Sequence, residues 1–169
     1  QYDKDVFFMR GRQALADGKY ALAIENFNVL SRLDTTDYYT YFFRGIAKYN
    51  LGDLRGAKRD FDQSVRLNPV FTSGWHYRGI TDSRFGNYEQ ALKDLQQAID
   101  LRPGYEGLYF SRGVTYFLSQ QFDKAVKDFD SRRSMGKIEK IIGMTVEASG
   151  PDCNIGDVCR IYKKDSPND

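Results

Sequence analysis

The feature that most constrains this chain is a repeat of 34 residues. The dipeptide Arg-Gly occurs four times at that step, at Arg10-Gly11, Arg44-Gly45, Arg78-Gly79 and Arg112-Gly113. Two more columns keep the same step, namely Ala23, Ala57, Ala91 and Ala125, and Phe27, Phe61, Leu95 and Phe129. Self-similarity at a period of this length indicates a solenoid whose units bury a core only by stacking on their neighbours.

Each unit contains two helical patterns. In the second unit, apolar or small side chains recur at i, i+3, i+7 and i+11 from Leu54 to Val65, which is helical spacing and not alternation. Gly45 and Ala57 are small, which predicts that two antiparallel helices approach closely there. The pattern predicts helices near 4–17, 20–32, 38–51, 54–67, 72–85, 88–101, 106–119 and 122–133.

Capping residues mark where the second helix of a unit begins. Asp53 and Asn87 each follow a turn glycine and precede an apolar stretch, so we expect both to act as N-caps. Gln90 stands three residues after Asn87 and would complete a capping box.

The segment from Trp75-His76-Tyr77-Arg78-Gly79 through Gly86-Asn87-Tyr88-Glu89-Gln90-Ala91 to Leu101-Arg102-Pro103 resembles a tetratricopeptide repeat almost column for column. The resemblance covers residues 4 to about 135. It implies an all-α fold, a right-handed superhelical array of four helical hairpins over residues 1–135. A short tail over 136–169 follows the array, and it is expected to be β-hairpin-like or irregular. The units are 4–37, 38–71, 72–105 and 106–139, the last one decaying.

The tail changes character. Alternating apolar residues around a Gly150-Pro151-Asp152 turn predict two short strands, near 137–148 and 156–163. Residues 136–163 also resemble the start of the N-terminal β-barrel of flagellar and type III secretion ATPases. The phosphate-binding loop of such enzymes is absent from the sequence. The tail is therefore a truncated next domain, a segment foreign to the array, or an accidental likeness.

The repeated arginine is unusual, because the common form of the motif has an apolar residue there. Sixteen residues after each arginine stand Asn26, Asp60, Asp94 and Asp128. We expect a ladder of partly buried ion pairs, Arg44–Asp60, Arg78–Asp94 and Arg112–Asp128, with the first rung weakened to Arg10–Asn26. The alternative is that the arginine column binds an acidic ligand.

The resemblance also implies a concave face lined by the first helix of each unit. The side chains expected on that face are Phe8, Arg12, Tyr39, Phe42, Ile46, Tyr49, His76, Ile80, Arg84, Phe110, Val114 and Phe117. An exposed row of rings and arginines predicts a groove for an extended or helical segment with apolar side chains. The alternative is that several of these rings pack on each other.

One subclass of tetratricopeptide repeat proteins is not expected here. Its co-chaperone members hold a C-terminal carboxylate with lysine and asparagine side chains on the concave face. At the matching positions this chain has Phe8, Phe42, His76 and Phe110, then Arg12, Ile46, Ile80 and Val114. Only Arg12 could serve in that role.

Other kinds of chemistry find little support. The formal charge of +2 indicates neither a nucleic-acid nor a membrane partner, and no apolar run of about 18 residues predicts membrane insertion. One histidine, His76, and two cysteines, Cys153 and Cys159, do not match a zinc site or a nucleophilic triad. We therefore expect no enzyme activity, no cofactor and no metal.

The expected function is a scaffold that binds a partner protein or peptide. The alternatives are a regulatory or targeting arm of a larger enzyme, in a secretion-type ATPase assembly, and self-assembly through the uncapped last repeat, with a homodimer through the C-terminal end. The compartment stays open: cytoplasmic, or periplasmic or extracytoplasmic if a signal peptide was removed before Gln1.

Overall fold

The computed structural model describes residues 3–130, 137–142 and 145–149. Within residues 3–130 the chain forms eight helices: α1 (Lys4–Ala16), α2 (Tyr20–Leu33), α3 (Tyr38–Leu51), α4 (Leu54–Leu67), α5 (Thr72–Phe85), α6 (Tyr88–Leu101), α7 (Glu106–Leu118) and α8 (Phe122–Asp130). The predicted all-α array is confirmed. Helix ends lie within one residue of those expected, except that α8, predicted to reach 133, is described only to Asp130.

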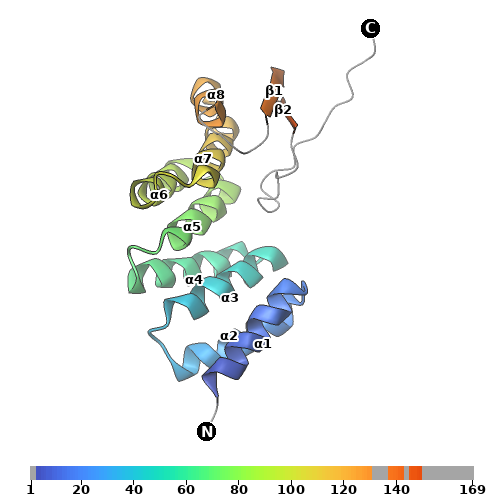
Figure 1. Ribbon diagram of the computed structural model, residues 1–169, viewed down its shortest axis with the longest axis vertical. Coiled ribbons are helices and arrows are strands. Elements are labelled where there is room, and N and C mark those ends of the chain that lie inside the picture. Colours follow the sequence, from blue (N-terminus) through green and yellow to red (C-terminus); the bar gives the residue numbers. More distant parts are fainter. Residues whose placement is uncertain (1–2, 131–136, 143–144, 150–169) are drawn as a thin grey trace.

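The helices form four hairpins that stack in sequence order (Figure 1). Each even-numbered helix packs against its hairpin partner, and α2, α4 and α6 also pack against the first helix of the next hairpin. The odd-numbered helices also contact one another, α1 with α3, α3 with α5 and α5 with α7. They therefore form one continuous row, the inner row of the array.

The glycine of the Arg-Gly dipeptide allows the two helices of a hairpin to touch. A Cβ atom on Gly45 would lie 2.7 Å from a ring carbon of Phe61, which is fully buried on α4. Gly11 and Gly113 stand in the same relation to Phe27 and Phe129, also at 2.7 Å. The column is glycine because the facing ring already fills the space of a side chain.

Three of the four turns inside the hairpins use a left-handed glycine. Gly18, Gly52 and Gly86 have φ angles of 71°, 87° and 81°. In the fourth turn Gln120 adopts the same conformation, with φ 63°. A residue with a Cβ atom is strained there, so the fourth hairpin is closed by a less favourable turn than the others.

Replacing Gln120 by Gly is expected to raise the free energy of unfolding by about 0.5–1 kcal/mol, because the strain is removed and only partly offset by the entropy of the unfolded chain. The reciprocal change Gly86→Gln should lower it by about 1 kcal/mol. Urea denaturation followed by circular dichroism measures both. A loss of stability in Gln120→Gly would contradict the strain argument.

The expected N-caps are realised in one case. The Asp53 Oδ1 atom accepts a hydrogen bond from the Gly56 backbone N–H at 2.9 Å, as expected. The capping box at Asn87 is wrong, because its side chain makes no cap hydrogen bond. The side-chain amides of Asn87 and Gln90 donate to carboxylates instead. Asn87 Nδ2 lies 3.5 Å from Asp82 Oδ1, and Gln90 Nε2 donates to Asp94 Oδ1 at 3.1 Å.

The described part of the tail is a two-stranded antiparallel hairpin. β1 (Lys137–Ile142) pairs with β2 (Thr145–Ser149), from Lys137 opposite Ser149 to Ile142 opposite Thr145. The prediction of one strand over 137–148 is therefore wrong, because the stretch is divided between two strands. The other predicted strand, 156–163, lies outside the described residues.

Candidate functional site

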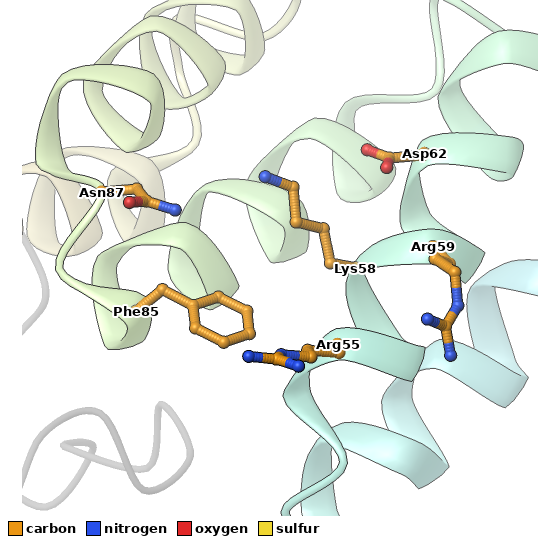
Figure 2. Close-up of a pocket in the computed structure, with 6 residues that line it drawn as sticks. All are labelled: Arg55, Lys58, Arg59, Asp62, Phe85 and Asn87. Carbon is orange, nitrogen blue, oxygen red and sulfur yellow. The ribbon is translucent and has the colours of Figure 1, made fainter.

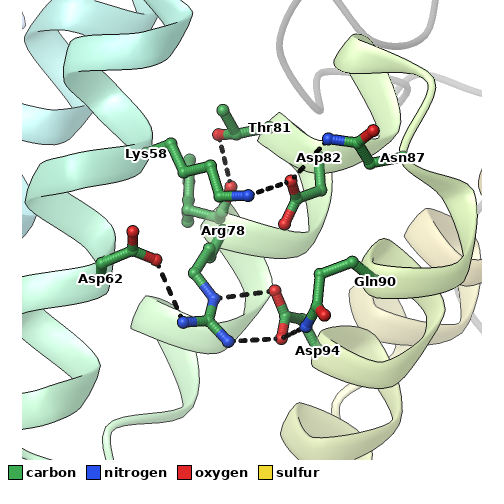
Figure 3. Close-up of polar contacts among 9 residues, drawn as sticks. Lys58, Asp62, Arg78, Thr81, Asp82, Asn87, Gln90 and Asp94 are labelled. Atoms are coloured by element: carbon green, nitrogen blue, oxygen red, sulfur yellow. Dashed lines mark hydrogen bonds and ion pairs between the residues drawn. The ribbon is translucent and has the colours of Figure 1, made fainter.

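Arg78 holds three helices together. Its guanidinium on α5 forms a bidentate pair with Asp94 on α6, with Nε to Oδ2 at 2.8 Å and Nη2 to Oδ1 at 2.7 Å (Figure 3). The remaining Nη1 atom donates to Asp62 Oδ1 on α4, at 3.1 Å. Asp94 is 2% exposed, so this arginine takes the place of water around its carboxylate.

The same arrangement recurs one unit before and one unit after. Arg44 forms a bidentate pair with Asp60, at 2.9 and 2.7 Å, and Arg112 with Asp128, at 2.7 and 2.6 Å. Each also reaches back to the preceding hairpin, Arg44 to Asn28 at 3.0 Å and Arg112 to Gln96 at 2.7 Å. Hydrogen bonding to Asp128 raises the pKa of Arg112 above its ordinary value, so this guanidinium stays charged at any physiological pH.

An aromatic ring three residues earlier covers each of these arginines. The guanidinium carbon lies 5.4, 4.8 and 5.4 Å from the ring centroids of Tyr41, Trp75 and Tyr109, respectively. The rings donate to backbone carbonyl oxygens of Thr35, Pro69 and Pro103 at 3.2, 2.8 and 2.9 Å. With side-chain exposures of 15–18%, the three arginines offer little to an outside ligand.

The first rung differs from expectation. Asn26 donates its side-chain amide to the Leu22 carbonyl oxygen at 2.9 Å, and Arg10 is exposed. No contact between Arg10 and Asn26 is formed in the described part of the chain. The neutral amide of Asn26 binds a guanidinium too weakly to compete with water for Arg10. In the described residues, no earlier hairpin covers Arg10 either.

Five of the twelve residues expected on the concave face are buried, and for them the prediction of an exposed row is wrong. The exposed fraction is 6% for Phe42, 4% for Tyr49, 5% for His76, 4% for Ile80 and 2% for Phe110. Each packs between hairpins of the array or, for Phe110, within the fourth one. The alternative, that several of these rings pack on one another, accounts for them.

Phe42 and Phe110 show how the rings are buried. The Phe42 ring centroid lies 4.9 Å from that of Phe71 and 5.5 Å from that of Tyr77. Phe110 packs on Phe129 at 5.6 Å.

The other predicted residues keep exposed surface. Arg12, Tyr39 and Arg84 are exposed, and Phe8 and Phe117 are half-buried. Arg84 stacks on the buried Tyr49 ring, with 4.9 Å between guanidinium carbon and ring centroid. Of the neighbouring positions in the row, Ile46 and Val114 are half-buried.

A contiguous cluster of partly exposed rings, the aromatic patch, joins the first three hairpins. It consists of Phe8, Tyr38, Tyr39, Phe43 and Phe71. Successive ring centroids lie 5.9 Å apart for Phe8 and Phe43, 6.1 Å for Phe43 and Tyr39, and 5.3 Å for Tyr39 and Phe71. Tyr38 stacks on Tyr39 at 4.5 Å. Tyr39 is 43% exposed and gives the patch its largest solvent-facing ring.

Arg12 stands beside the aromatic patch. Its guanidinium carbon lies 4.3 Å from the Phe43 ring centroid and 5.8 Å from that of Phe8. No ion pair of Arg12 is formed within the described residues. Stacking holds the cation over the Phe43 ring while leaving its hydrogen-bond donors free for a carboxylate.

Three residues of the aromatic patch were not predicted from the sequence: Tyr38, Phe43 and Phe71. One signal for Phe71 was available, because it occupies the N-cap of α5 where Asp37 caps α3. A phenylalanine cannot accept the capping hydrogen bond, which indicates that the ring has another use.

His76 belongs to the interior. Its Nε2 atom is 2.8 Å from the Ser111 Oγ atom, and the rings of Tyr77 and Tyr105 lie 5.5 and 6.0 Å away. Burial lowers the pKa of His76 to about 4. The side chain is therefore a neutral link between α5 and α7 at physiological pH.

Among residues 3–130, 137–142 and 145–149, no three His, Cys, Asp or Glu side chains are grouped so that they could hold a metal ion. In the same part of the chain, no helix has the length and apolar character needed to cross a membrane.

Two segments match known families. Residues 38–71 match the family described as "Tetratricopeptide repeat", and residues 85–120 match one described as "TPR repeat". In addition, a stretch of 35 residues is 46% identical to the flagellum-specific ATP synthase of Bacillus subtilis (strain 168). That match covers 21% of this chain and 8% of the other protein, so the two share only a small part of that protein's length.

Solved structures share the fold at low sequence identity. MamA from Desulfovibrio magneticus RS-1 is 23% identical with a TM-score of 0.70, over 76% of this chain and 73% of that one. TTC0263 of Thermus thermophilus is also 23% identical, with a TM-score of 0.68, over 76% and 72%. The first repeat domain of Spaghetti (RPAP3), bound to the HSP90 peptide SRMEEVD, is 22% identical with a TM-score of 0.61, over 76% and 94%.

Proposed function

We propose that this chain, whose residues 38–71 and 85–120 are tetratricopeptide repeats, is a non-enzymatic scaffold that binds a partner protein or peptide on the inner row of its helices. The observation that carries the proposal is the aromatic patch with Arg12 stacked against it. Partly exposed rings and arginines are the side chains that most often dominate binding energy at interfaces. The fold shared with a peptide-bound repeat domain supports the same class of function.

The patch also sets the chemistry of the partner. Tyr39, Phe43 and Phe71 offer ring faces and edges to an apolar side chain, and Arg12 offers donors to a neighbouring carboxylate. The partner segment that fits is extended or helical, with apolar anchors and at least one acidic residue. A segment held only by a C-terminal carboxylate does not fit, because Phe42, His76 and Phe110 are buried at the other matching positions.

Replacing Tyr39 by Ser should abolish most of this binding. Tyr39 is the most exposed ring of the patch, so its loss removes contact area while the buried core is unchanged. A partner recovered with the wild-type chain from a lysate of the native host should bind Tyr39→Ser at least about tenfold more weakly, measured by calorimetry.

The matched control is Leu51→Ser, which removes another exposed apolar side chain from the far end of the same helix. It should bind within about twofold of the wild type. Thermal denaturation checks that both variants are folded. Equal affinity of Tyr39→Ser and wild type would place the binding surface elsewhere.

A second candidate function has one observation in its favour. The 35-residue match to a flagellum-specific ATP synthase supports a role as the regulatory or targeting arm of a secretion-type ATPase assembly. Size-exclusion chromatography of this chain mixed with the flagellum-type ATPase of its own host tests it. Co-elution supports the assembly, and independent elution contradicts it.

A further inference from the structure

A second surface feature lies at the other end of α5 from the aromatic patch. Phe71 precedes α5 and Phe85 ends it, and 14 helical residues span about 21 Å. Here an open depression of ≈ 380 Å³ is formed by α4 and by the turn after α5 (Figure 2). Its lining residues are Arg55, Lys58, Arg59, Asp62, Phe85 and Asn87. We call it the α4 pocket.

The positive charge of the α4 pocket is not required by the fold. The three basic positions, Arg55, Lys58 and Arg59, correspond in the other units to Ala21, Ile24 and Glu25, to Glu89, Leu92 and Lys93, and to Asp123, Val126 and Lys127. The repeat therefore accepts acidic, apolar and small side chains at these positions. Only in α4 are all three basic, so packing does not explain them.

Two of the three cations remain uncompensated. Lys58 pairs with the fully buried Asp82 at 2.7 Å, and Asp62 pairs with Arg78 at 3.1 Å (Figure 3). Arg55 and Arg59 form no ion pair in the described part of the chain. Both are exposed, on successive turns of α4, and Arg55 extends toward the Phe85 ring, which is 38% exposed (Figure 2). The pocket thus presents two free guanidinium groups and an apolar wall.

This geometry matches an extended acidic peptide. Side chains at i and i+4 of a helix are about 5–6 Å apart at Cβ, and alternate residues of an extended chain are about 6.6 Å apart. Two carboxylates at alternate positions can each face one arginine, which binds carboxylates in bidentate fashion. A following apolar side chain would then cover Phe85.

Nucleic acid fits the surface less well. A nucleic-acid backbone needs a stripe of cations along several elements. The basic cluster is confined to α4, because the following units place Glu89 and Asp123 at the position of Arg55. The Glu89 side chain is 88% exposed. The charge pattern therefore favours a short acidic peptide.

We propose that the α4 pocket is a second docking site, for an extended protein segment with two alternating acidic residues followed by an apolar one. It is separate from the aromatic patch, so one scaffold would hold two segments at once, of the same partner or of different partners. Linking two modest contacts in this way raises the overall affinity without enlarging either surface.

The test uses the full chain and a fluorescein-labelled peptide with two Glu residues at alternate positions followed by Leu. Fluorescence anisotropy should show binding to the wild type that weakens with salt, and Arg55→Gln/Arg59→Gln should bind at least about tenfold more weakly. The matched control, Lys93→Gln/Lys127→Gln, removes two basic charges from α6 and α8 and should stay within about twofold. Phe85→Ser should weaken binding of the Leu peptide but not of a Ser counterpart.

Several outcomes would overturn the proposal. Equal losses in the two double variants would indicate general charge attraction. Equal binding of a peptide with Gln in place of Glu would exclude recognition of the carboxylates. Displacement of the peptide by oligo-dT at lower concentration than by unlabelled peptide would assign the surface to nucleic acid. Tyr39→Ser should bind this peptide as tightly as the wild type does. The test of the α4 pocket is therefore independent of whether the proposed site on the inner row binds a partner.

Discussion

Replacing Arg78 by Met is expected to lower the free energy of unfolding by about 3–5 kcal/mol. The substitution keeps the aliphatic stem but leaves Asp94, which is 2% exposed, with a buried charge and no cation. It also releases Asp62 on α4 and removes the stacking on Trp75, so one of the polar links between the second and third hairpins is lost. Urea denaturation of wild type and variant measures the difference.

Two controls separate the ion pair from the effect of removing any arginine. Arg10→Met changes the same column in the first hairpin, where the side chain is exposed and makes no contact with Asn26, and should cost less than about 0.5 kcal/mol. The double variant Arg78→Met/Asp94→Leu replaces the pair by apolar side chains and should recover most of the stability. Similar losses in Arg10→Met and Arg78→Met would show that the pairing contributes little.

The helices could be predicted because each helix is specified several times. The columns of Ala23 and Phe27 recur in every unit, so a weak pattern in one hairpin is supported by the other three. The pairs of Arg44, Arg78 and Arg112 followed from a similar argument, since a constant spacing of sixteen residues joined opposite charges in three units. Regularity along the chain was the source of both predictions.

Exposure along the inner row could not be predicted, because it depends on residues outside the row. Phe8 and Phe42 occupy the same column, yet Phe8 is half-buried and Phe42 is 6% exposed. The difference comes from the residue before the next helix: Phe71 covers Phe42, whereas the corresponding Asp37 caps α3 and covers nothing comparable. A single substitution in a connecting loop decides whether a ring is available to a partner.

The α4 pocket was hidden for a different reason. The net charge of +2 sums over the whole chain, so acidic residues at the same positions of α6 and α8 offset the three cations on α4 and conceal them. Comparing the units column by column would have shown the excess at Arg55, Lys58 and Arg59. The pairing of Lys58 with Asp82, which leaves two arginines free, is visible only in the structure.

The stability of this protein is expected to fall by about 2 kcal/mol between about pH 7.5 and about pH 5 because of His76 alone. Burial lowers the pKa of His76 from its ordinary 6.5 to about 4, so the folded chain keeps the imidazole neutral where the unfolded chain protonates it. The unfolded state therefore binds more protons over this range, and the free energy of unfolding decreases as the pH falls from 6.5 towards 4.

The chain contains a single histidine, so one variant isolates the effect. His76→Gln keeps a hydrogen-bonding group opposite Ser111 but does not titrate, and its stability should be nearly constant over the same pH range. Urea denaturation of both proteins at a series of pH values gives the two curves. The stability of the wild type minus that of the variant should decrease as the pH falls and level off near pH 4, where carboxylate protonation begins to affect both proteins alike. Parallel curves would mean that the imidazole of His76 is solvated in the folded protein.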